Sequence, residues 1–316
     1  MSDSVLELPG LDAQNPLGFL AALGLLRVLD DHCRKRELVL PRLAFANDGS
    51  FQARLHTRVP YPGLKDVILS DAEAQAASAA LQLAYDDAGG LCAPASRDAT
   101  RDLKPSPQAA RDFLAAVASS PRREADLASG FFSELVQDNN GNTKPTALHF
   151  TAGQQTFLSM VESLRAGMTG AGLDEALLGP WRNTSPLPSL SWDASVTRLY
   201  ALRASDPSGE KRGSVPAANW LAVHALAYFP VFARRGRLQT TAVEGGWKDS
   251  VFTWPCWEVA ASVQTITALL RSSARGLAAR QRSALGIIAV FACGITRSDQ
   301  GGYGSFTPAD VIAPRA

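Results

Sequence analysis

A strongly apolar run lies near the beginning of the chain, over residues 17–26. Asn15 before it is a good N-cap, and Pro16 suits the first helical position, where no N–H donor is needed. Polar positions then recur at helical spacing on one face, at Arg27, Asp30, Asp31 and Arg34. The pattern predicts one capped, mostly buried helix, in which small residues such as Gly24 would let another element approach its backbone closely.

Two stretches alternate between apolar and polar positions and therefore predict β-hairpins. The first covers residues 37–59 and turns at Asn47-Asp48-Gly49. The second covers residues 237–257 and turns around Gly245-Gly246. One or two further strands are expected over residues 190–208. The apolar run 284–295 is ambiguous, because its length and composition suit a strand or a helix.

Periodicity near 3.6 predicts further helices with loops between them. Thr151 and Gln154 form a capping-box pattern, so a helix is expected to start there. The other predicted helices cover residues 71–85, with Ser70 or Asp71 as the cap, 106–120, 214–229, and about 258 to 282. Loops are expected over residues 86–108, which are rich in Gly, Pro, Ser and Asp, and over the polar residues 138–147.

This succession of helices and antiparallel hairpins predicts an α+β fold. If the chain divides into two lobes, the seam is the segment 169–190, which is rich in Gly, Pro and Ser. It would separate an N-terminal lobe, residues 1–168, from a C-terminal lobe, residues 191–316. The first lobe would hold the buried first helix, the first hairpin and the polar loop.

Composition and charge exclude several classes of protein. Apolar residues make up 46% and charged residues 19% of the 316 residues, a globular balance. The formal net charge of +1 gives no global field, so a nucleic-acid surface must be a local patch. The first helix does not resemble a secretory signal, because acidic residues precede it and basic residues follow it. Arg27 interrupts it too soon for a membrane span, so we expect a cytoplasmic protein without a membrane segment.

The sequence holds few candidates for catalytic or metal chemistry. Its four cysteines include no CxxC pair, and no GxxxxGK[ST], HExxH or GxSxG motif occurs. None of the four histidines has the spacing of a metal ligand to another His, Cys or carboxylate, and His224 in its apolar helix is expected to be a core residue. We therefore predict no catalytic residues, no metal and no cofactor. A metal-dependent nuclease that uses His149 is the less favoured alternative.

Positive charge is concentrated in a few places, although the chain as a whole is nearly neutral. Such clusters suit a protein that grips a phosphate backbone locally, while ordinary solvated surface explains any single one of them equally well. The predicted phosphate contacts are Arg34, Lys35, Arg36, Arg122, Arg123, Arg234, Arg235, Arg237 and the stripe Arg271 and Arg275, which would continue to Arg282 on one face of the long helix.

A second group of candidates carries amides, which can donate to and accept from base edges. The group consists of Asn139, Asn140, Asn142 and Lys144 in the polar loop, with Gln154 and Gln155 close by. Asn and Gly also favour tight turns, and Gln154 can simply cap its helix. Trp247, Trp254 and Trp257 around the second hairpin could stack on bases, although packing in the core is the commoner role for an aromatic residue.

The segment LPGLDAQNPLGFLAALGLLRVLDD, residues 8–31, resembles the N-terminal signature of CRISPR-associated proteins. In large-subunit and accessory families of type I effector complexes, a Pro-Gly or Asn-Pro leads into a helix of the LAALGLLR type. The resemblance is to proteins of subtype I-G, formerly I-U. Three other segments are similar: FTAGQQTFLSMV, LYALRASDPS and GGYGSFTPADV. Each is short, and none is a catalytic motif.

This resemblance implies a non-catalytic subunit of an RNA-guided complex of the Cascade type that acts in antiviral defence. Such a subunit recognises the short motif beside the target, binds double-stranded DNA with the subunits that carry the CRISPR RNA, and helps recruit a helicase-nuclease. This chain is shorter than typical large subunits, so an accessory protein is also open. A protein-only adaptor, which binds the helicase-nuclease or another subunit through an apolar surface, is the main alternative.

Overall fold

The computed structural model describes residues 4–151, 155–196, 213–272, 274–297 and 304–314. Its strands are β1 (Ser4–Asp12), β2 (Arg42–Phe45), β3 (Gln52–Thr57), β4 (Phe132–Gln137), β5 (Thr143–Pro145), β6 (Val231–Arg234), β7 (Arg237–Thr240), β8 (Val243–Glu244), β9 (Val251–Trp257), β10 (Ile287–Arg297), β11 (Gly304–Phe306) and β12 (Asp310–Pro314). Its α-helices are α1 (Pro16–Lys35), α2 (Tyr61–Ala74), α3 (Pro107–Ala118), α4 (Arg122–Ala128), α5 (Phe157–Ala166), α6 (Gly170–Leu178), α7 (Pro216–Ala225), α8 (Val263–Arg271) and α9 (Ala279–Ala284).

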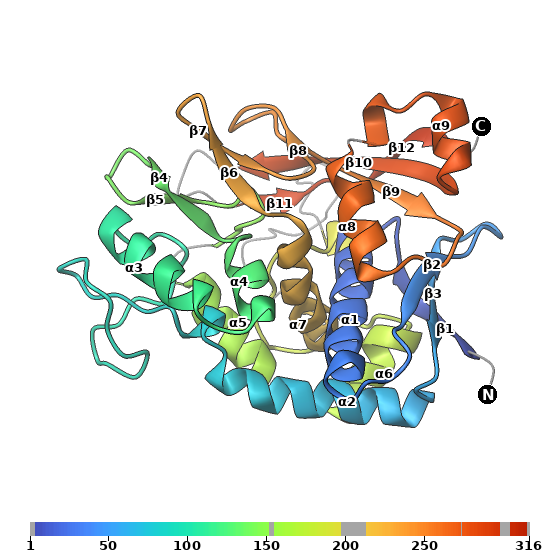
Figure 1. Ribbon diagram of the computed structural model, residues 1–316, viewed down its shortest axis with the longest axis horizontal. Helices are drawn as coiled ribbons and strands as arrows, with labels where there is room; N and C mark the ends of the chain where they lie inside the picture. The colour runs from blue at the N-terminus through green and yellow to red at the C-terminus, as the bar shows by residue number, and fades with distance from the viewer. Residues whose placement is uncertain (1–3, 152–154, 197–212, 273, 298–303, 315–316) are drawn as a thin grey trace, which may run out of the picture.

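The fold is α+β with antiparallel strand pairs, as the sequence predicts. In Figure 1 the helices α1 to α7 fill the lower part of the molecule, and β4 to β12 form a layer above them. The largest sheet has the order β11-β10-β9-β8, and β12 also pairs with β10. The sheet β1-β3-β2 lies along one side, and β4–β5 and β6–β7 are separate hairpins.

Helix α1 lies in the core and packs along α7. It begins at Pro16 as predicted, and the Asn15 side chain accepts the N–H of Leu17 at 3.1 Å. A Cβ atom on Gly24 would lie only 1.7 Å from the carbonyl oxygen of Leu221 in α7. The two helix backbones are therefore in contact, which confirms the close approach that the small residues predict. None of the described helices, α1 included, is long and apolar enough to cross a membrane.

The first predicted hairpin is confirmed, and the second is confirmed in part. Leu43 in β2 lies opposite Leu55 in β3, on the two sides of the predicted turn. The second hairpin is β8–β9, while Arg237–Thr240 pairs with β6 instead. The ambiguous run 284–295 lies mostly in strand β10, where it is central to the largest sheet.

Two of the three tryptophans around the second hairpin belong to the core. Trp254 and Trp257 are at most 1% exposed. Their indole N–H groups donate to the carbonyl oxygens of Ala13 and Leu43, at 2.9 Å and 2.8 Å. Trp247, by contrast, is 49% exposed. The structure thus separates one tryptophan that a ligand can reach from two that it cannot.

Several predicted helix boundaries were wrong. The helix expected over 71–85 overlaps only the last residues of α2, which begins at Tyr61, ends at Ala74 and contains Ser70 and Asp71 instead of being capped by them. The rest of the expected range contains two short 3₁₀ helices, Gln75–Ala77 and Ala80–Gln82. The helix expected from Thr151 begins at Phe157. The long helix expected over 258–282 is divided into α8 and α9, since Ser272 and Gly276, both poor helix formers, lie between them. Of the strands expected over 190–208, residues 190–196 form none, and the remainder lies outside the described residues.

Residues from both predicted lobes contribute to one hydrophobic cluster. Helix α1 from the first packs along α7 from the second. The segment 169–190, predicted as the seam, contains α6, whose Leu173 and Leu177 are buried. Gly10 in β1 lies so close to α6 that its Cβ would be 2.4 Å from the carbonyl oxygen of Ala176. The division into lobes stays a prediction.

We predict that Gly24→Ala lowers the free energy of unfolding by about 3 kcal/mol, near the upper end for overpacked cores. The added methyl group would collide with the α7 backbone at Leu221, which cannot rotate away as a side chain could. Urea denaturation followed by circular dichroism measures the change.

Gly63→Ala in α2 is the matched control, because its Cβ would meet only ordinary contacts, the nearest at 3.5 Å. Alanine has the higher helix propensity, so this variant should be as stable as the original protein or more stable by up to about 1 kcal/mol. Equal stabilities for the two variants would contradict the close contact between α1 and α7.

Candidate nucleic-acid interface

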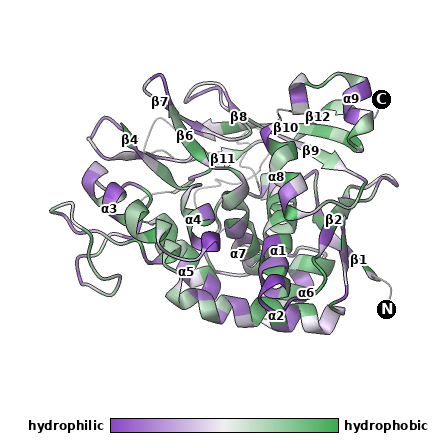
Figure 2. Cartoon of the chain, in the orientation of Figure 1, coloured by the Kyte–Doolittle hydropathy of each residue, from purple (hydrophilic) through white to green (hydrophobic). Residues whose placement is uncertain are grey.

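Two hairpins lie next to each other at one end of the strand layer, β4–β5 and β6–β7 (Figure 1). Their tips are the loop 138–142 and the residues Arg234–Arg237. Both tips include hydrophilic residues, drawn in purple in Figure 2. The structure therefore brings together two groups of predicted DNA contacts that are far apart in the sequence.

The β6–β7 hairpin ends in a two-residue turn, Arg235-Gly236, in which φ is 50° and 71°. Positive φ at both positions is the pattern of a type I′ turn, which matches the twist of the strands. Arg234 and Arg237 are paired directly across this turn, and like charges in such a pair destabilise a hairpin. All three arginines are exposed, and none forms an ion pair with another described residue. The tip thus concentrates positive charge that a polyanion would neutralise.

The β4–β5 tip is ordered by its own acidic residue. Oδ1 of Asp138 accepts the backbone N–H groups of Asn140 at 2.8 Å and Asn142 at 3.1 Å. These bonds fix the turn without using the amide side chains. Asn139 and Asn140 are exposed, and Asn142 is half-buried. Two amide side chains are therefore presented to solvent on a defined loop.

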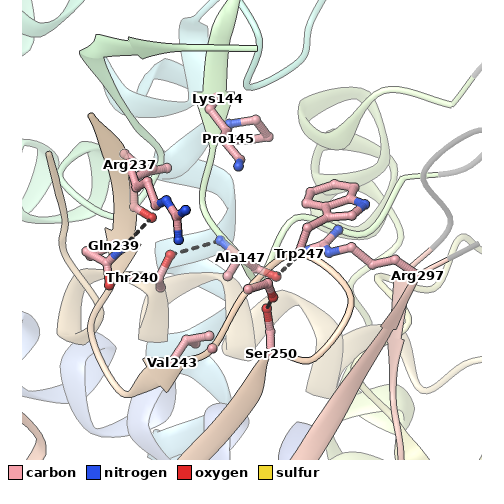
Figure 3. Close-up of a pocket in the computed structure, with 13 residues that line it drawn as sticks. Lys144, Pro145, Ala147, Arg237, Gln239, Thr240, Val243, Trp247, Ser250 and Arg297 are labelled. Atoms are coloured by element: carbon pink, nitrogen blue, oxygen red, sulfur yellow. Dashed lines mark hydrogen bonds between the residues drawn. The ribbon is translucent and has the colours of Figure 1, made fainter. Parts of the chain in front are cut away.

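A cavity of about 680 Å³ lies at the base of these hairpins (Figure 3). Three cationic side chains line it: Lys144 from β5, Arg237 from β7 and Arg297 at the end of β10. No acidic residue occurs among the described residues that line it. In Figure 3 Lys144 and Arg237 point into the same space, and the guanidinium of Arg297 lies against the indole of Trp247. The cavity is therefore electropositive and has one aromatic wall.

Arg297 is a half-buried cation without an acidic partner among the described residues. Its Nη2 donates to the carbonyl oxygen of Ala147 at 2.7 Å and its Nη1 to that of His149 at 3.4 Å. The guanidinium carbon lies 4.1 Å from the ring centroid of Trp247 and 5.4 Å from that of Phe150. Burial lowers the pKa of Arg297 to about 10, because desolvation penalises the charged form. The group stays charged at neutral pH and is held in a fixed position.

The segment 147–149, whose carbonyl oxygens hold Arg297, is itself held by hydrogen bonds to other parts of the chain. The buried imidazole of His149 bonds through Nε2 to Oδ1 of Asp102 at 2.8 Å. Asp102 also accepts the N–H of Phe157 at the start of α5, at 3.0 Å. His149 and these hydrogen bonds hold the pKa of Asp102 at about 2, against the opposing effect of burial. The indole of Trp192 donates to the Leu148 carbonyl at 2.9 Å, so hydrogen bonds hold the segment next to Ala147, which lines the cavity.

The basic cluster at the end of α1 differs from the hairpin tips. Arg34 is paired with Asp30 at 2.6 Å, and Lys35 with Asp31 at 2.7 Å. Arg36 lies 3.3 Å from Nδ1 of His32. These residues are exposed, but two of the three charges are already neutralised by their own helix. The cluster adds less to a positive field than its sequence suggests.

The pair Arg122-Arg123 is divided between the surface and the interior. The Arg122 side chain is 92% exposed and lies 3.8 Å from Asp126. Arg123 is only 13% exposed and joins three helices, since its guanidinium donates to Asp71 of α2 at 2.8 Å and to Asp31 of α1 at 2.9 Å. In this position Arg123 serves the packing of α4 against α1 and α2.

The predicted stripe along one long helix was wrong, because the helix is divided. Arg271 ends α8, and Arg275 lies in a separate short turn. Arg271 nevertheless lines a second cavity, of about 650 Å³, together with Arg234 of the β6–β7 hairpin. Arg275 lies 3.9 Å from Glu244. Tertiary packing thus brings Arg271 to the same cavity as Arg234 of the β6–β7 hairpin, which helical spacing in the sequence could not reveal.

The two glutamines of the second candidate group have different outcomes. Gln154 lies outside the described residues, whereas Gln155 is exposed just before α5.

The residues that sequence reasoning missed are Arg297 and Phe150. Arg297 ends an eleven-residue strand whose other residues are mostly buried. A charged residue at the end of a buried strand is the signal that could have identified it.

The described residues contain no group of three or more His, Cys, Asp or Glu side chains that could hold a metal ion. His149, the residue considered for a nuclease, is 4% exposed and bonded to Asp102.

No protein-family model matches the sequence of this chain, and no curated protein matches it.

We predict that the free energy of unfolding decreases as the pH is lowered below about 6.5. The cause is His224, a buried residue near Arg123. Burial, with Arg123 as the second cause, lowers its pKa to about 3, against 6.5 for the ordinary group. Below pH 6.5 the unfolded chain therefore binds the proton that the folded chain refuses. The free energy of unfolding should decrease by about 1.4 kcal/mol between pH 8 and pH 5.5.

Urea titrations at several pH values measure how the free energy of unfolding changes with pH. His224→Gln should remove this pH dependence, while the m-value, which is the slope of the free energy against urea concentration, stays the same. A pH dependence that persists in the glutamine variant would show that another group titrates, and would contradict the assignment to His224.

Proposed function

We propose that this protein is a cytoplasmic, non-catalytic subunit of an RNA-guided CRISPR effector complex that binds target DNA next to the guide-paired segment. One observation carries the proposal: two adjacent hairpins present cations without acidic partners among the described residues, around a cavity with an exposed tryptophan. Together with the resemblance of residues 8–31, this arrangement favours a polyanionic partner. In such a complex the helicase-nuclease would be a separate protein that this subunit helps recruit.

The two hairpins suit two different parts of the duplex. The arginines at the β6–β7 tip would contact phosphates, which gives affinity without sequence preference. The amides of Asn139 and Asn140 at the β4–β5 tip would reach base edges, because their loop backbone is already satisfied by Asp138. A short motif beside the target could thus be read while the phosphates are gripped.

A protein-only adaptor is the second candidate, and exposed apolar side chains on the same hairpins favour it. Leu135 in β4 is 72% exposed and Phe232 in β6 is 49% exposed. Either residue could contact another protein of the complex. Co-purification with a helicase-nuclease that survives nuclease treatment would favour this candidate over DNA binding.

We predict that replacing Arg234, Arg235 and Arg237 together by alanine weakens binding to duplex DNA at least tenfold at about 0.1 M salt. Each lost phosphate contact removes about 0.9 from the slope of log affinity against log salt, so the slope should decrease by about 2 to 3. Fluorescence anisotropy of a labelled duplex at several salt concentrations, with the purified complex and with the protein alone, measures both quantities.

Arg280→Ala is the matched control, because Arg280 is exposed on α9 at the other end of the strand layer (Figure 1). It changes the charge by one and should alter affinity by less than about twofold if the interface is local. Absence of duplex binding at every salt concentration, alone and in the complex, would refute the proposal.

A further inference from the structure

The cavity beneath the hairpins has the chemistry of an anion site. Lys144, Arg237 and Arg297 converge on it, and the described lining contains no carboxylate. Arg297 is held there although desolvation disfavours its charge, and its Nε is buried without a hydrogen-bond partner among the described residues. A cation kept in such a place is stabilised when an anion enters.

The size of the cavity restricts that anion. Its volume of about 680 Å³ lies within the range of roughly 300–1,000 Å³ that small ligands occupy. A single nucleotide is a ligand of this class. A base pair inside a duplex cannot enter, because its bases are stacked on their neighbours and only their edges are accessible from the grooves.

The aromatic wall adds a surface for a base. Trp247 is 49% exposed, and Arg297 supports its ring at 4.1 Å from the centroid. Arg297 is fixed by the carbonyl oxygens of Ala147 and His149, so the indole rests on a rigid support. Lys144 Nζ lies farther away, 5.5 Å from the same centroid, on a flexible side chain. The ring surface that remains open can stack against a base, since every base has a flat face.

We infer that this cavity binds one unpaired nucleotide, with its base against Trp247 and its phosphate between Lys144 and Arg237. The inference deepens the proposed DNA-binding function and rests on it. It adds that the protein recognises a strand already separated from its partner, as well as the duplex that the hairpin tips contact. DNA and RNA share the chemistry that this site recognises, namely a free base face and a phosphate.

Tryptophan fluorescence tests the inference directly, because Trp247 is the most exposed of the described tryptophans. Trp192, Trp220, Trp254 and Trp257 are buried, and Trp181 is half-buried with its N–H bonded to the carbonyl of Ala176. Addition of single-stranded oligothymidylate should quench the emission in a saturable way. Oligouridylate in a parallel titration shows whether the site prefers a DNA or an RNA strand.

Trp247→Ala should abolish the quenching and weaken binding of the labelled single strand about 5- to 150-fold, the range that corresponds to about 1–3 kcal/mol per stacked base. Duplex affinity should fall much less than single-strand affinity, because Arg234 and Arg235, the other cations of the β6–β7 tip, do not line this cavity. Trp181→Phe is the control and should keep both the quenching and the affinity. Lys144→Gln should lower the salt slope for the single strand by about 0.7.

The outcomes separate this inference from the proposed function. Duplex binding without any quenching by either oligonucleotide would overturn the nucleotide site and leave the proposed function standing. Quenching that Trp247→Ala leaves intact would also overturn it. If the original protein binds neither the duplex nor the single strand, both the proposed function and the nucleotide site are refuted.

Discussion

The contact between α1 and α7 at Gly24 is the constraint on which the rest of the structure depends. At this point two buried helices touch through their backbones, because residue 24 has no Cβ. Helix α1 comes from the beginning of the chain and α7 from its last third, so their contact joins distant parts of the sequence in one core. The Arg123 network, with Asp31 of α1 and Asp71 of α2, ties α4 to the same helices. The strand layer lies above this helical base (Figure 1).

The candidate interface is built on that base by a short series of contacts. Asp102 fixes His149, and the segment 147–149 supplies the carbonyl oxygens that hold Arg297. Arg297 in turn supports Trp247. Each step leaves one group less free to move, so the cavity is organised before any ligand enters. A ligand would then lose little of its binding free energy to ordering the protein.

Local sequence signals predicted part of the local structure, and they predicted the distant contacts poorly. Asn15 and Pro16 placed the start of α1, and the turn at Asn47-Asp48-Gly49 placed the first hairpin, because both signals act within a few residues. The division between α8 and α9 was missed, since the apolar periodicity continues across it. Strands β5, β7 and β10 come together at this cavity only through tertiary packing, so no spacing in the sequence could show that Lys144, Arg237 and Arg297 line it. The sequence also could not distinguish Arg237, which has no acidic partner among the described residues, from Arg123, which joins three helices.

The central proposal is that DNA binds to the β4–β5 and β6–β7 hairpins and at the cavity at their base. Photo-crosslinking of the proposed complex to target DNA that carries 5-bromodeoxyuridine, followed by mass spectrometry of the crosslinked peptides, tests this placement directly. The account predicts crosslinks within residues 132–150 and 231–250, including Trp247, which is exposed beside the cavity. Crosslinks confined to the end of α1 or to α9, or none at all while the DNA remains bound to the complex, would contradict it.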